Sequence, residues 1–61
     1  MDLTPQDRSL LSVTTLLNRL GLSILDKRTE LGTGAIRLLV GRGKQPELAI
    51  TIMDDGRVFY E

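Results

Sequence analysis

The stretch that most constrains the fold is Ala35 to Val40, which reads Ala-Ile-Arg-Leu-Leu-Val. It is the most apolar run outside the first twenty residues, and glycine-containing turn signals border it at Gly32-Thr33-Gly34 and Gly41-Arg42-Gly43. A short apolar run between turn signals is typical of a buried strand. We therefore expect this run to be the central strand of a small antiparallel sheet on which the rest of the chain packs.

A helix is predicted from Pro5 to Leu20. Thr4 suits the N-cap because its hydroxyl accepts an orphan backbone N–H, and Pro5 suits the first helical position because it needs no donor. Asp7 completes a short version of the capping box, and Gly21 supplies a left-handed stop. The apolar residues recur at helical spacing and predict one buried stripe: Leu10, Val13, Leu17 and Leu20, widened by Leu11 and Leu16.

Residues 22–31 are expected to pair with the central strand, although their composition leaves open whether they form a full strand. Ile24 and Thr29 favour a strand, whereas Lys27 and Glu30 do not. A two-residue loop at Gly32-Thr33 places Leu25 opposite Val40 and Thr29 opposite Ile36.

Two further strands complete the sheet. Residues 41–46 are a loop by composition, and Glu47 to Met53 follow as a strand. Asp55-Gly56 predicts a type I′ hairpin, which places Met53 opposite Val58, Ile52 opposite Phe59 and Thr51 opposite Tyr60.

The predicted fold class is α+β, with one N-terminal helix packed on a four-stranded antiparallel β-meander in the order α-β-β-β-β, in a single domain of residues 1–61. One face of the sheet is expected to bury the helix stripe. That face comprises Leu25, Leu31, Ile36, Leu38, Val40, Leu48, Ile50, Ile52 and Phe59.

The composition limits the chemistry of the chain. A domain of 61 residues buries only about 60% of the surface of its unfolded chain, so it often needs a further stabilising element. The sequence has no Cys and no His, which excludes disulfides and ordinary zinc sites and leaves an oligomer or a bound partner. No apolar run approaches the about 20 residues of a membrane span, and Met-Asp-Leu-Thr-Pro lacks the basic head of a signal peptide. We therefore expect a cytoplasmic protein that does not act at a membrane.

The second face of the predicted sheet is the first candidate site. One helix cannot cover both faces, and the exposed face combines apolar and charged residues, as partner surfaces do. We predict contacts to another protein or to a second copy of the chain; an ordinary solvated surface is the alternative. The expected contact residues are Leu39, Met53, Val58 and Tyr60, with Arg28 and Arg37 at the polar rim.

The loop of residues 41–46 is the second candidate site. Arg42, Gly43 and Lys44 combine positive charge with a mobile backbone, which suits a phosphate or a nucleic-acid backbone. The spacing of a P-loop is missing, and a solvated hairpin connection is the simpler reading. The formal net charge of zero and the low aromatic content also argue against a dedicated nucleic-acid binder.

Catalysis is not expected. The chain has no His or Cys to act as a base or a nucleophile, and its serines have no evident activating partner. Asp54 and Asp55 are adjacent carboxylates, but a cation needs more oxygen ligands, and turn chemistry explains them better. We expect no metal and no cofactor.

Overall fold

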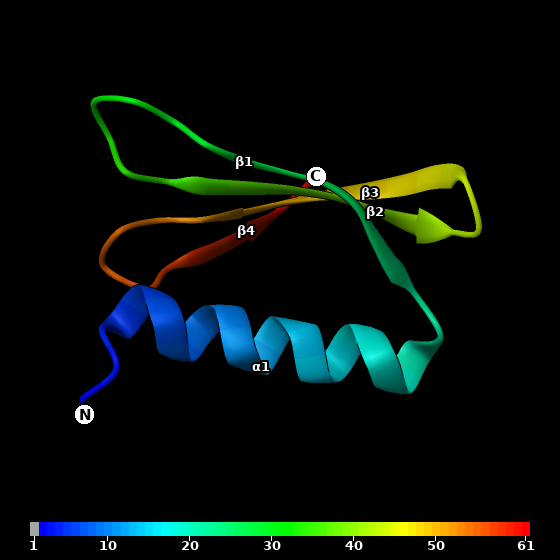
Figure 1. Cartoon of the computed structure of the whole chain (residues 1–61), viewed down its shortest axis with the longest axis horizontal. Coiled ribbons are helices and arrows are strands. Elements are labelled where there is room, and N and C mark those ends of the chain that lie inside the picture. Colours follow the sequence, from blue (N-terminus) through cyan, green and yellow to red (C-terminus); the bar gives the residue numbers. More distant parts are fainter. Residues whose placement is uncertain (1) are drawn as a thin grey trace.

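The structure, a computed structural model, describes residues 2–61 and consists of one helix followed by a four-stranded antiparallel sheet (Figure 1). The strands lie side by side in chain order, β1-β2-β3-β4. The predicted fold class is therefore confirmed. The elements are α1 (Pro5–Leu20), β1 (Ser23–Thr29), β2 (Ile36–Arg42), β3 (Gln45–Ile52) and β4 (Val58–Tyr60).

Helix α1 begins and ends where its capping residues predict. The Oγ1 of Thr4 accepts the backbone N–H of Asp7 at 3.1 Å, and the Asp7 carboxylate accepts the N–H of Thr4 at 3.4 Å. Gly21 has φ 73° and donates to the Asn18 carbonyl, while the N–H of Leu22 donates to the Leu17 carbonyl at 2.9 Å. These two bonds form a Schellman motif, which satisfies carbonyls that the helix end leaves free. None of the helices within residues 2–61 is long and apolar enough to cross a membrane.

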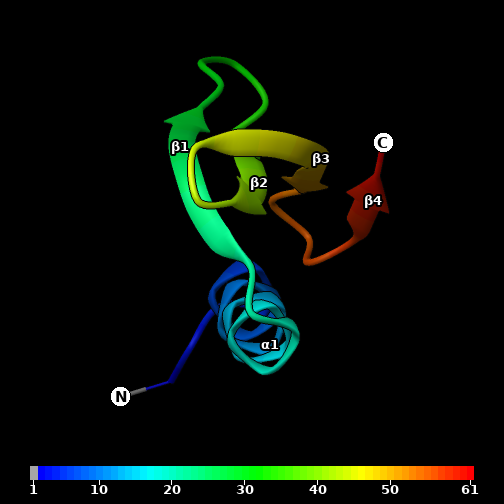
Figure 2. The same ribbon diagram turned by 90° about the vertical axis from the view of Figure 1, so that its right-hand side faces the viewer.

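The hydrophobic core lies between α1 and one face of the sheet (Figure 2). The predicted alternation along β2 and β3 is confirmed, because Ile36, Leu38, Val40, Ile50 and Ile52 are all buried. The helix contributes a narrower stripe than predicted. Val13 and Leu17 are buried and Leu10 packs against them, whereas Leu11, Leu16 and Leu20 are exposed. A helix that lies on one face of a sheet buries only the residues nearest the sheet, so the flanks of the stripe stay in solvent.

The hairpin between β1 and β2 has the predicted register near its loop but not further along. Thr29 lies opposite Ile36 as predicted, but a bulge leaves Leu25 unpaired and places Ile24, not Leu25, opposite Val40. A bulge inserts one residue in one strand only, so it shifts every pairing beyond it.

The loop of this hairpin is also longer than predicted. Glu30 donates to Ala35 at 2.8 Å and accepts from Gly34 at 3.1 Å, so residues 31–34 form the loop. The prediction that Leu31 belongs to the core is therefore wrong, since its side chain is 98% exposed at the loop tip.

The predicted register between β3 and β4 is wrong by one residue. Met53 donates to Arg57 at 2.8 Å and accepts from Gly56, so Asp54, Asp55 and Gly56 form a three-residue loop. A type I′ turn needs a positive φ at both central residues, whereas Gly56 alone in this loop has a positive φ, 95°.

The shift exchanges the two faces of β4. Val58 lies opposite Ile52 and Tyr60 opposite Ile50, so both belong to the helix side of the sheet, and Phe59 lies opposite Thr51 on the other side. A slip of one residue moves a side chain across the sheet because strand side chains alternate. The predictions that Phe59 joins the core, and that Val58 and Tyr60 share a face with Leu39, are therefore wrong.

Candidate interaction surface

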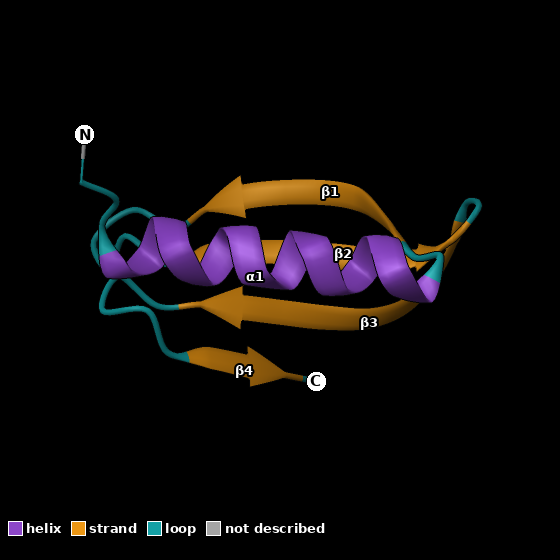
Figure 3. Cartoon of the chain, turned by 90° about the horizontal axis from the view of Figure 1, so that it is seen from below, coloured by secondary structure: helices purple, strands orange, loops and turns teal. Residues whose placement is uncertain are grey.

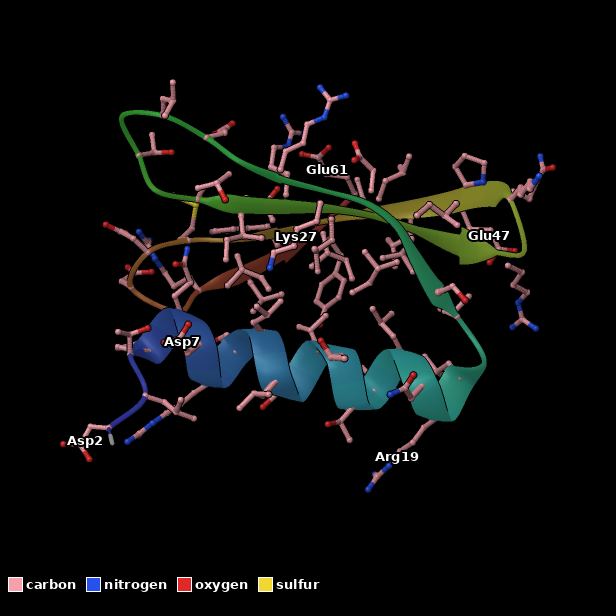
Figure 4. All side chains as sticks on the ribbon, in the orientation of Figure 1. Asp2, Asp7, Arg19, Lys27, Glu47 and Glu61 are labelled. Atoms are coloured by element: carbon pink, nitrogen blue, oxygen red, sulfur yellow. The ribbon has the colours of Figure 1, made fainter. Side chains whose placement is uncertain are left out.

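The outer face of the sheet is the side that α1 does not cover. In Figure 4, Glu61 lies on this outer side of the sheet and Lys27 lies on the helix side. The strand pairing brings residues from all four strands into two rows on this face. One row is Asp26, Leu39, Ala49 and Glu61, and the other is Arg28, Arg37, Thr51 and Phe59.

Apolar side chains occupy the middle and the β4 end of the outer face. Leu39 is 37% exposed and Phe59 is 49% exposed, while Ala49 and Thr51 between them are half-buried. Met53 follows β3 and is also half-buried. This face therefore presents a leucine of β2 and a phenylalanine of β4 to solvent, separated by Ala49 and Thr51 of β3.

Charged side chains lie among these apolar residues. The guanidinium of Arg37 lies 3.9 Å from the Glu30 carboxylate and 3.8 Å from that of Glu61, and Arg28 Nε lies 2.9 Å from Asp26 Oδ2. All of these groups are substantially exposed, so each ion pair contributes little to the free energy of unfolding. The Arg37–Glu61 pair joins β2 to β4 across β3, so charged groups lie between Leu39 and Phe59 as well as beside them.

The structure brings together only part of the predicted contact set. Leu39, Arg28 and Arg37 lie on the outer face, and Met53 borders it. Val58 and Tyr60 lie on the helix side, and Phe59, which the sequence reading assigned to the core, takes their place. The signal that would have found Phe59 is the length of the preceding turn, because a three-residue loop reverses the alternation along β4.

The basic loop is shorter than predicted. Strand β2 extends to Arg42 and β3 begins at Gln45, so only Gly43 and Lys44 connect them. Gly43 has φ 59°, whereas Lys44 does not have a positive φ. A positive φ at the first central residue alone is typical of a type II′ turn. Arg42 Nε lies 3.7 Å from the carboxylate of Glu47, so part of the positive charge of the loop is already neutralised.

The acidic pair at the β3–β4 turn has a structural role. Asp55 Oδ1 accepts the backbone N–H of Arg57 at 3.1 Å, and its Oδ2 accepts Arg57 Nε at 2.7 Å. The backbone hydrogen bond, together with the nearby guanidinium, lowers the pKa of Asp55 from its ordinary value of 3.8. Within residues 2–61, no group of three acidic side chains is placed to hold a metal ion.

No pocket opens in the surface formed by the described part of the chain, residues 2–61. No protein-family model, curated protein or solved structure matches this chain. The fold and the outer face together define a small α+β domain with one uncovered sheet face. Its function is therefore argued from its own residues.

Proposed function

We propose that this chain is a small non-enzymatic interaction module that binds another protein, or itself, through the outer face of its sheet. The observation that carries the proposal is that α1 lies over one face only, while the other face exposes Leu39 and Phe59 among charged side chains. Exposed apolar side chains combined with polar and charged ones are common in non-obligate protein interfaces.

The residue types on this face support the same function. Phenylalanine and arginine are both enriched at interfaces, and one row of the outer face contains Arg28, Arg37 and Phe59, with Thr51 between Arg37 and Phe59. A small domain also gains stability from such contacts, because any partner that binds only the folded state stabilises that state.

A charge on the outer face tests this proposal. Leu39→Glu should abolish association because it replaces an exposed apolar side chain of this face with a carboxylate, and Met53→Glu should weaken it from the border. Leu31→Glu is the matched control, since Leu31 is equally apolar but lies at a loop tip away from this face. The measurement is molecular mass across a concentration series, together with affinity capture of partners by each variant.

The result expected is that wild type and Leu31→Glu retain the same partners and that Leu39→Glu loses them. Circular dichroism should show the same folded state for all three proteins. The proposal fails if the folded Leu39→Glu protein still captures the partners that wild type captures.

A second candidate function is binding of a phosphate or a nucleic-acid backbone at Arg42, Gly43 and Lys44. It is supported by the two-residue Gly43-Lys44 turn, which places Arg42 and Lys44 together at one end of the β2–β3 hairpin. Arg42→Ala with Lys44→Ala should weaken binding to a single-stranded oligonucleotide and reduce its dependence on salt. No binding by wild type at low salt would eliminate this candidate.

A further inference from the structure

Strand β4 has an unpaired edge with a defined set of backbone groups. Glu61 exchanges two hydrogen bonds with Ala49, at 2.8 and 3.3 Å, and Arg57 accepts from Met53. Hydrogen-bonded residues alternate along an antiparallel strand, so Val58 and Tyr60 direct their N–H and C=O groups away from β3. Because β4 is the last strand of the sheet among residues 2–61, these groups face outward.

Apolar side chains lie on both sides of this edge. Phe59 is exposed on the outer face, and Tyr60 is 56% exposed on the helix side because β4 lies beyond the flank of α1 (Figure 3). Leu16 and Leu20, 45% and 52% exposed, are on the flank of α1 nearest β4. Ser9 identifies that flank, since its hydroxyl donates to the Gly56 carbonyl at 2.5 Å and the two leucines follow it at helical spacing.

The charges along β4 are complementary to those of a second β4 in the opposite direction. Arg57 and Glu61 lie at equal distances in the chain from Phe59, with opposite charge and on the same face. If two copies pair antiparallel with Phe59 opposite Phe59, Arg57 of each copy lies opposite Glu61 of the other. Opposite charges at directly facing positions favour a strand pair.

The same pairing also aligns the free backbone hydrogen-bonding groups of the two strands. The same register places Val58 of one copy opposite Tyr60 of the other, and these are the residues whose backbone groups face outward. Both strands therefore offer donors and acceptors at the same positions, and the two-fold axis repeats every contact.

The other edge of the sheet is not suited to pairing with a second copy. Strand β1 has a bulge at Leu25 and the charged run Asp26, Lys27 and Arg28. Bulges and edge charges are the features by which proteins prevent strand addition.

We propose that two copies of this chain pair through β4, antiparallel and centred on Phe59, into one continuous sheet with both helices on the same side. The pairing encloses Tyr60, Leu16 and Leu20 between the two helices. It uses the β4 edge and the α1 flank, so it does not depend on docking at the outer face.

Charge reversal tests the proposal. Arg57→Glu or Glu61→Arg alone places like charges at two symmetric contacts, and each should raise the dimer dissociation constant about tenfold or more. The double variant Arg57→Glu with Glu61→Arg restores both contacts and should return the constant to within about threefold of wild type. Sedimentation equilibrium over a concentration series measures these constants.

Lys27→Glu is the matched control, because Lys27 is an exposed cation on β1, at the opposite edge of the sheet from β4. It should leave the dimer constant unchanged. The pairing is overturned if wild type stays monomeric up to about 1 mM, or if the double variant does not recover. Association lost in Leu39→Glu and Arg28→Glu but kept in Arg57→Glu would also overturn it, and would assign association to the outer face.

Amide hydrogen exchange gives a second readout that does not depend on substitutions. The N–H groups of Val58 and Tyr60 should become protected only at concentrations at which the dimer forms, whereas the N–H of Phe59, which faces β3, should be protected at all concentrations. Equal exchange of Val58 and Tyr60 at high and low concentration would contradict the pairing.

Discussion

Gly41 shows how the hairpin between β2 and β3 restricts a single residue. A β-carbon at this position would lie 1.8 Å from the carbonyl oxygen of Gln45, a separation at which the backbone must move. The register shift between Val40 and Gly41 accompanies this close approach. The absence of a side chain at Gly41 therefore permits the close approach of β2 and β3.

Replacing a glycine in the left-handed conformation with alanine typically costs about 1–2 kcal/mol. Gly41→Ala should lower the free energy of unfolding by more than that amount. Gly43→Ala is the control, because Gly43 has φ 59° but nothing within 4 Å of its added β-carbon. Urea denaturation of both variants measures the difference. Equal losses would mean that the strands move apart at Gly41 without cost.

Asp55 makes the stability contributed by the β3–β4 turn depend on pH. Because its pKa in the folded protein is below 3.8, its carboxylate contributes stability that is present above pH 3.8 and is lost as pH falls through the folded-state pKa. An NMR titration of the Asp55 carboxyl group should have its midpoint below 3.8.

Arg57→Ala should reverse only part of this shift, since the largest cause is the backbone N–H of residue 57, which alanine retains. A midpoint at or above 3.8 in wild type would contradict the hydrogen bond to that N–H.

At the scale of elements, α1 is held at its first two turns by polar contacts to the sheet end. Gln6 Nε2 donates to the Gly34 carbonyl at 2.7 Å and to the Ile52 carbonyl at 3.2 Å. Ser9 donates to Gly56 from the next turn. These bonds connect the helix start to both loops at that end, so the orientation of α1 depends on more than its apolar stripe.

Thr4→Ala should destabilise the protein by about 1 kcal/mol, because it removes the side-chain acceptor at the N-cap. Thr15→Ala on the same helix should instead stabilise the protein slightly, by less than about 1 kcal/mol. The Thr15 hydroxyl only donates back to the Leu11 carbonyl, and alanine is the better helix former. Thermal denaturation followed by circular dichroism compares the two. A stabilised Thr4→Ala protein would refute the capping role.

At the scale of the whole molecule, stability depends on one thin core. The core is a single layer between α1 and the helix side of the sheet, and its most enclosed side chains come from β2 and β3. These are the two central strands, which are covered by neighbours on both edges.

Ile50→Ala should cost about 2–5 kcal/mol, a large part of the total stability of a domain of this size. Ile24→Ala, at an exposed isoleucine of β1, should cost under about 1 kcal/mol. Guanidinium denaturation measures both. Similar losses at the two positions would show that β1 and β3 are equally buried in solution.

Features that depend on residues close together in the chain follow from the amino-acid sequence alone. The bounds of α1 follow from Thr4, Asp7 and Gly21, whose capping bonds are local. The buried face of β2 and β3 follows from alternation, because each second residue is apolar along both strands.

The tertiary structure alone decided which way β4 faces, and with it the composition of the outer face. The choice between a two-residue and a three-residue turn moves Phe59 and Tyr60 across the sheet, and the sequence Asp-Gly permits both. The observed turn is stabilised by the Ser9 contact with Gly56, which comes from a residue 47 positions away in the chain. Strand side chains alternate with a period of two, so a one-residue difference in a turn reverses a whole strand, and only long-range contacts select between the outcomes.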